Sequence, residues 1–69
     1  GSEMCIRDSH DTVAAVLPLL AAKMAPGGVV LCETEREADL PEQAGALTLV
    51  KQYNYGKIKV SRYERGEEV

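Results

Sequence analysis

The stretch Ala25-Pro26-Gly27-Gly28-Val29-Val30-Leu31-Cys32-Glu33 decides the fold that we expect from this sequence. Its proline cannot continue a helix and its two glycines tolerate left-handed backbone, so the stretch ends a preceding helix. Residues 29–32 are then continuously apolar and are followed by Glu33, a pattern typical of a strand covered on both faces, as in a parallel sheet. A helix followed by such a strand is half of a βαβ unit, which favours the α/β class.

Residues 11–24 carry apolar side chains at the spacing of one helical face. These residues, at i, i+3, i+4 and i+7 positions, are Val13, Val16, Leu17, Leu20 and Met24. Ser9 and Asp11 are candidate N-caps. Pro18 lies within this segment, where it removes one hydrogen bond and costs about 3 kcal/mol, so we expect a kink or a helix that restarts there.

Two segments after the apolar strand predict a β-hairpin. Residues 47–53 and 57–63 are rich in β-branched and aromatic side chains with two-residue alternation, and Gly56 between them supplies the positive φ of a short turn. The connection that precedes the hairpin, residues 33–42, carries five acidic residues against one arginine. It lacks the ordered ligand spacing of a calcium loop, so we expect a solvated linker.

Length and composition limit the classes of protein. At 69 residues the chain is small for a domain, and two cysteines and one histidine do not build a zinc site, so marginal stability and no bound metal are expected. The longest apolar stretch, residues 13–22, is interrupted by proline and is shorter than the roughly 20 residues that span a bilayer. The first residues do not form a secretion signal. These features predict a cytoplasmic protein with no membrane partner.

The segment Met4-Cys5-Ile6-Arg7-Asp8-Ser9 resembles the translated end of a common sequencing transposon. We therefore expect residues 1–9 to be an adapter-derived artefact, the parent protein to be longer, and Cys32 to be the only native thiol. The alternative is a native N-terminal arm. A single cysteine in an apolar strand is usually a small buried side chain and not a nucleophile.

From residue 19 onward the sequence resembles the C-terminal portion of the bacterial methyltransferases that modify the exocyclic amine of a guanine in small-subunit ribosomal RNA. The motifs that carry the resemblance are Leu19-Leu20, 25–30, Cys32-Glu33, Leu40-Pro41-Glu42, Leu49-Val50-Lys51, Tyr55-Gly56-Lys57 and Val60-Ser61-Arg62-Tyr63. The Pro-Gly-Gly turn is common among Rossmann-like methyltransferases, whereas the Leu-Pro-Glu linker followed by the Tyr-Gly hairpin is narrower.

The resemblance implies that residues 10–64 are the C-terminal part of a Rossmann-like methyltransferase sheet. That part would comprise one helix, one buried strand and an antiparallel β-hairpin, forming a three-stranded mixed sheet. Strands 29–33, 57–63 and 47–53 would be neighbours in that order, with the helix over one face. Residues 65–69 would form a polar tail.

The resemblance also implies the function of the parent, which is methylation of the guanine N2 amine with S-adenosylmethionine as methyl donor. The partner would be ribosomal RNA or the small ribosomal subunit. The family's cofactor-binding and amine-positioning motifs lie upstream of the matched region, so we expect no catalytic or cofactor-binding residue here and no activity from this chain alone. Two alternatives stay open: a fragment of a DNA adenine or other amine methyltransferase, and a free-standing RNA-binding module without enzymatic activity.

The candidate RNA contacts lie on the predicted hairpin, where residues 51–62 contain four basic residues and no acid. They are Lys51, Tyr53, Tyr55, Lys57, Lys59 and Arg62, with the lysines and arginine for phosphates and the tyrosines for stacking on a base. The alternative is a solvated strand whose lysines protect a sheet edge. Glu33, predicted to end its strand, is a candidate for the edge of an active-site crevice, with an ordinary strand-end acid as the alternative. His10 has no catalytic partner nearby in the sequence. The modified nucleotide and the oligomeric state stay open.

Overall fold

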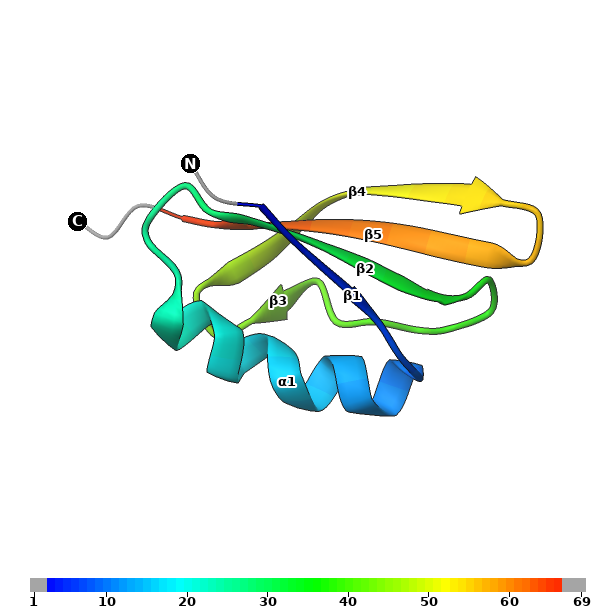
Figure 1. Cartoon of the computed structure of the whole chain (residues 1–69), viewed down its shortest axis with the longest axis horizontal. Coiled ribbons are helices and arrows are strands. Elements are labelled where there is room, and N and C mark those ends of the chain that lie inside the picture. Colours follow the sequence, from blue (N-terminus) through cyan, green and yellow to red (C-terminus); the bar gives the residue numbers. More distant parts are fainter. Residues whose placement is uncertain (1–2, 67–69) are drawn as a thin grey trace.

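The computed structural model describes residues 3–66, which form one α-helix packed on a five-stranded β-sheet (Figure 1). The elements, in chain order, are β1 (Glu3–Arg7), α1 (His10–Lys23), β2 (Val29–Glu35), β3 (Gln43–Ala44), β4 (Leu47–Tyr55) and β5 (Ile58–Arg65). The turn between β4 and β5 lies at one end of the long axis, beyond the helix (Figure 1).

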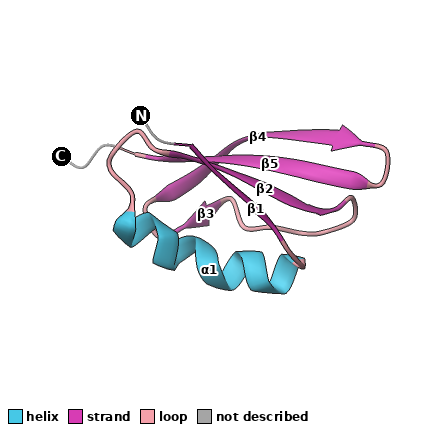
Figure 2. Cartoon of the chain, in the orientation of Figure 1, coloured by secondary structure: helices cyan, strands magenta, loops and turns pink. Residues whose placement is uncertain are grey.

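The strands lie across the sheet in the order β1-β2-β5-β4-β3. β1 runs parallel to β2, and the other neighbouring strands are antiparallel (Figure 2). β1 and β2 are parallel because α1 joins them and returns the chain to the end of the sheet where β1 began. The described part of the sheet therefore has α1 on one face, and we call the other face the open face.

The helix is continuous from His10 to Lys23, so it does not restart at Pro18, and the alternative expectation of a kink there stays a prediction. Pro18 is exposed, while Val13, Leu17 and Ala21 on the other side of the helix are buried against the sheet. Burial of such side chains contributes about 1.5–3 kcal/mol for each larger one, which offsets the hydrogen bond that proline removes. The helix ends as predicted, because Gly27 follows Pro26 with a φ of 84°.

The core lies between α1 and the face of the sheet that it covers. Its buried members are Val13, Leu17, Ala21, Met24, Val30, Cys32, Leu40, Ala44, Leu47 and Tyr63. Leu49 and Ile6 pack against this cluster from β4 and β1. Val30 and Cys32 from β2 and Tyr63 from β5 alternate with residues of the open face, as the two-residue period of a strand requires.

The fold class predicted from the sequence is wrong in the number of strands. The order β2-β5-β4 contains the three expected strands, but the sheet described by residues 3–66 has five, and not three. The sequence does not predict β1, because residues 1–9 are expected to be an adapter-derived artefact; their origin stays a prediction. β3 was missed because it has only two residues, too few for an alternation pattern.

The acidic connection is only partly solvated. Its acidic side chains at positions 37, 39 and 42 are exposed, but Ala38 and Leu40 are buried. The hydroxyl of Tyr63 donates a hydrogen bond to the backbone oxygen of Pro41. The prediction of a wholly solvated linker is therefore wrong, because the buried side chains of Ala38 and Leu40 and the hydrogen bond from buried Tyr63 hold the segment against the sheet.

The two ends of the predicted hairpin also differ from the sequence expectation. β4 reaches Tyr55 and β5 begins at Ile58, which leaves a two-residue turn in which Gly56 has a φ of 61°. Positive φ at the first turn position alone is typical of a type II′ turn. At the other end, Arg65 belongs to β5 and pairs with the backbone of Gly28, so the predicted polar tail starts later than residue 65. Residues 67–69 of that tail lie outside the described residues.

Candidate functional site

The hairpin candidates are divided between the two faces of the sheet. Residues paired directly across an antiparallel ladder project to the same face. Lys51 pairs with Arg62, and Tyr53 and Tyr55 pair with Val60 and Ile58. Their partners Arg62, Val60 and Ile58 alternate along β5 with residues on the helix side, among them buried Ser61 and Tyr63. These three pairs therefore lie on the open face.

Lys51, Tyr53 and Tyr55 form one continuous row along β4. The Nζ atom of Lys51 lies 5.2 Å from the centroid of the Tyr53 ring. The centroids of the Tyr53 and Tyr55 rings are 6.3 Å apart, and the ring planes differ by 20°. The Tyr55 side chain is 63% exposed, whereas Tyr53 is half-buried. We call these three residues the aromatic row.

A β-bulge places the aromatic row on the open face. Leu49 pairs with Tyr63 and therefore faces the core, whereas the next paired residue of β4 is Lys51, opposite Arg62. Val50 is the extra residue between the two pairs. If Val50 instead occupied a regular paired position, residues 51, 53 and 55 would share the core-facing side of Leu49, because alternate residues of a regular strand face the same way.

Lys59 and Lys57 do not join the aromatic row. Lys59 pairs with Asn54 on the helix side of the sheet, and its Nζ atom donates a hydrogen bond of 2.8 Å to the backbone oxygen of Ala38. Lys57 lies in the turn, where its backbone oxygen accepts a hydrogen bond of 2.9 Å from the Arg36 amide. The six predicted contacts therefore do not form one surface.

Arg36 lies at the hairpin turn and was not predicted from the sequence. Its Nη1 atom donates to the backbone oxygen of Gly56 at 3.4 Å, and its own amide donates to Lys57. In the sequence Arg36 is the single base of an acidic run, which hid its proximity to a turn that lies about twenty residues further along the chain. The turn thus gathers Arg36 and Lys57.

Glu33 lies within β2, because the strand continues to Glu35, so the prediction that Glu33 ends its strand is wrong. Its Oε1 atom lies 3.5 Å from Nε of Arg7 in β1. Glu33 pairs with Val60 and therefore faces the open side, where Arg7, Glu33, Thr34 and Ile58 line a cavity of about 250 Å³. Its position is that of an ion-paired carboxylate on an open sheet face.

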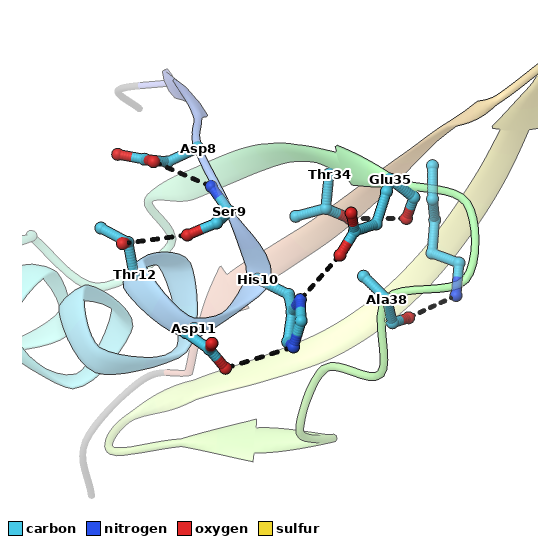
Figure 3. Close-up of polar contacts among 9 residues, drawn as sticks. Asp8, Ser9, His10, Asp11, Thr12, Thr34, Glu35 and Ala38 are labelled. Atoms are coloured by element: carbon cyan, nitrogen blue, oxygen red, sulfur yellow. Dashed lines mark hydrogen bonds and ion pairs between the residues drawn. The ribbon is translucent and has the colours of Figure 1, made fainter.

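His10 has partners that the sequence analysis missed. Its Nδ1 atom lies 2.8 Å from Oε1 of Glu35, and its Nε2 atom lies 3.2 Å from Oδ1 of Asp11 (Figure 3). Glu35 ends β2, so this contact joins the start of α1 to the end of that strand. A separation of 25 residues gave no local pattern from which to predict the contact.

Cys32 and Tyr63 are buried ionisable groups in the core. Burial raises the pKa of the Cys32 thiol to about 12, with a smaller contribution from the neighbouring Cys5. Burial likewise raises the pKa of the Tyr63 hydroxyl to about 12, with Cys32 adding to the effect. A thiol that keeps its proton is a poor nucleophile, so Cys32 acts as a small packing side chain.

Residues 3–66 contain no group of three or more histidine, cysteine, aspartate or glutamate side chains arranged to hold a metal ion. Within the same range, no helix has the length and apolar character needed to cross a membrane.

Comparison with known proteins gave a similarity in structure but no match in sequence family. No protein-family model and no curated protein matches the sequence. A solved structure of a conserved hypothetical protein from Streptococcus pyogenes superposes with a TM-score of 0.82 and 27% sequence identity. The match covers 96% of this chain but only 43% of that protein, so the chain spans less than half the length of its structural neighbour. The name of that neighbour does not mention a methyltransferase. The described sheet has five strands where three were predicted, so the prediction that residues 10–64 form the C-terminal part of a Rossmann-like methyltransferase sheet is wrong.

Proposed function

We propose that this chain is part of a longer S-adenosylmethionine-dependent methyltransferase that modifies the N2 amine of a guanine in small-subunit ribosomal RNA. The observation that carries the proposal is the strand order β2-β5-β4, in which the last strand, β5, lies antiparallel between β2 and β4. The sequence resemblance implies this order, and most of the motifs that carry the resemblance lie along these strands and the linker.

The match to 43% of a longer solved protein supports a parent that is longer than this chain. Methyl transfer requires the amine nitrogen to be held in line with the methyl group, so its rate depends mainly on positioning. When bound, S-adenosylmethionine would supply the electrophilic methyl group. The motifs that would hold the cofactor and the amine lie upstream of the matched residues, so this chain contributes scaffold and RNA contact and is inactive alone. The proposed compartment is the cytoplasm, where ribosomal RNA is found.

A second candidate is a free-standing RNA-binding module without enzymatic activity. The exposed aromatic row favours it, because this row is complete within the chain and needs no upstream segment. A fragment of a DNA adenine or other amine methyltransferase is the third candidate. It differs from the leading proposal only in the acceptor, which the upstream motifs would select.

Methyl transfer by the longer gene product distinguishes these candidates. The longer protein, recovered by extending the gene upstream, is incubated with S-adenosylmethionine labelled in its methyl group and with small ribosomal subunits or adenine-containing duplex DNA. The proposal predicts label in RNA as N2-methylguanosine. Label in DNA adenine would support the third candidate, and the absence of transfer to any acceptor would support the binding module.

The chain alone is the matched control for this assay. It is expected to transfer no methyl group and to give no heat of binding when titrated with S-adenosylmethionine in a calorimeter. Micromolar affinity of the 69-residue chain for the cofactor would contradict the division of roles proposed above.

A further inference from the structure

The open face of the sheet carries the only pair of stacked tyrosines within residues 3–66. Alternate residues of a strand are separated by about 6.6 Å, which matches the 6.3 Å between the two ring centroids, so the rings follow the strand side by side. Tyr55 is 63% exposed, although burial of an aromatic ring is favourable. A large aromatic side chain held in order at the surface is a preferred contact for a flat ligand.

Cationic groups accompany the aromatic row on the same face. The Lys51 ammonium lies over the Tyr53 ring, and among residues 3–66 no ion pair involves it. Arg62, directly opposite Lys51, has one contact of 3.2 Å from Nη2 to Glu64, and its side chain is 40% exposed. A cation beside exposed aromatic rings is the arrangement with which proteins bind single-stranded nucleic acid, since the cation attracts phosphate while the rings stack on bases.

The unpaired position of Val50 places Lys51, Tyr53 and Tyr55 on the same face as Arg62. It moves residues 51, 53 and 55 away from the core-facing side on which Leu47 and Leu49 lie. Bulges are common where a strand must redirect a side chain near a functional site. β3 pairs only with the first part of β4, through Ala44 and Gln43, so the aromatic row lies on a part of β4 that no further described strand covers.

From this geometry we propose that the aromatic row binds unpaired nucleotides of single-stranded RNA. The bases stack on Tyr55 and Tyr53, and Lys51 with Arg62 contacts the phosphates. Lys59 takes no part, because it lies on the opposite face and donates to Ala38. The choice of RNA as the partner rests on the proposed function, whereas the choice of single strands rests on the rings, since bases in a duplex have no free face.

The test is the binding of a fluorescently labelled short oligouridylate to the purified chain, followed by anisotropy. Tyr55→Ala is expected to weaken binding by between about five-fold and about 100-fold, as loss of one stacked base does. Tyr55→Phe keeps the ring and is expected to bind like the original chain. Duplex RNA of the same length should compete poorly. An unchanged affinity of Tyr55→Ala, or equal binding of duplex and single strand, would overturn the inference.

The salt dependence of RNA affinity distinguishes a specific contact by Lys51 from a general effect of the protein's positive charge. Lys51→Ala is expected to reduce the slope of log affinity against log salt by about 0.7, the value for one phosphate contact in a single strand. Lys23→Ala removes the same charge at the exposed end of α1 and should leave the slope unchanged. Equal effects of the two substitutions would contradict a localised surface. Circular dichroism of each variant verifies that it folds.

The inference and the proposed function fail in different experiments. Oligouridylate binding that depends on Tyr55, together with no methyl transfer by the longer protein, would retain the aromatic row and reject the enzyme. Methyl transfer by the longer protein that is unaffected by Tyr55→Ala, with no oligouridylate binding by the chain, would retain the enzyme and reject the aromatic row. Binding of an acidic peptide in preference to oligouridylate would also reject it, because peptides offer no bases for stacking.

Discussion

Lys51 lies directly opposite Arg62 in the β4–β5 hairpin, although Leu49, two residues earlier, lies opposite Tyr63. One extra residue, Val50, therefore separates a part of β4 that packs in the core from a part that carries the aromatic row outward. The same strand contributes to stability at one end and offers a binding surface at the other.

Deleting Val50 is expected to preserve the aromatic row. The deletion makes Leu49–Tyr63 and Lys51–Arg62 consecutive pairs of a regular ladder, so each side chain keeps its face. Oligouridylate affinity should stay within about three-fold of the original. This change is smaller than the tenfold change in affinity that corresponds to roughly 1.4 kcal/mol of binding free energy. Anisotropy and circular dichroism provide the measurement.

Deleting Gln52 is the matched control. This change also shortens β4 by one residue, but with the turn held in place it moves Lys51 opposite Ser61, on the helix side. The Gln52 Nε2 to Ser61 Oγ hydrogen bond of 3.1 Å is then lost, which leaves a buried hydroxyl unpartnered at a cost of about 1–3 kcal/mol. If the two deletions reduced affinity and stability equally, the assignment of the bulge would be wrong.

Gly56→Ala should destabilise the hairpin. Gly56 has a φ of 61°, where an alanine side chain is strained, and we expect a loss of about 1–2 kcal/mol in the free energy of unfolding. Gly66→Ala is the control, since Gly66 does not have positive φ and an added Cβ would meet no atom within 4 Å. Urea denaturation compares the two variants. Equal stabilities would count against the type II′ turn.

Tyr63→Phe should lower stability without changing the fold. The substitution removes the hydroxyl that donates to Pro41 while keeping the buried ring, so the expected cost is about 0.5–1.5 kcal/mol. Hydrogen exchange should become faster at Ala38, whose amide bonds to Glu35 in the connection that Tyr63 holds. Tyr55→Phe, at an exposed ring, is the control and should leave both measurements unchanged. Unaltered exchange at Ala38 in Tyr63→Phe would show that the hydroxyl does not anchor the linker.

Stability should fall at alkaline pH. The pKa of Cys32 rises from 9.0 to about 12 and that of Tyr63 from 10.0 to about 12 in the folded protein. Well below pH 9.0 both groups are protonated whether the chain is folded or unfolded, so their contribution is constant. Between pH 9.0 and about 12 the unfolded chain loses protons that the folded protein keeps, so the free energy of unfolding decreases as pH rises.

The Cys32→Ala variant distinguishes the contribution of the Cys32 thiol from the titration of lysines, which occurs in the original chain and in the variant alike. The variant should show a shallower decline of unfolding free energy across the same alkaline range, measured by urea denaturation at several pH values. A thiol reagent at neutral pH should modify exposed Cys5 quickly and buried Cys32 only after unfolding. Parallel declines in the two proteins would contradict the burial of an un-ionised Cys32 thiol.

The sequence predicted the elements whose signals are local. Helical spacing identified α1, the Pro-Gly-Gly turn identified its end, and alternation with Gly56 identified the hairpin. The face of the sheet on which each residue of β4 after Val50 lies could not be predicted. A bulge shifts the two-residue period, and nothing in the amino-acid composition marks its position. For this reason Lys59 was grouped with Lys51, from which the sheet separates it. The contact of His10 with Glu35 and the position of Arg36 at the turn depend on tertiary structure and had no local pattern.

The central claim is that the aromatic row is the surface by which this chain contacts RNA, and residue-resolved NMR tests it most directly. The chain, labelled with ¹⁵N, is titrated with a short oligouridylate, and amide shift changes are mapped on the structure. We predict that the largest changes fall at Lys51, Tyr53 and Tyr55 and extend to Arg62, with little change at Lys59 or along α1. Changes concentrated on α1 or around Lys59, or none at saturating oligouridylate, would contradict the claim.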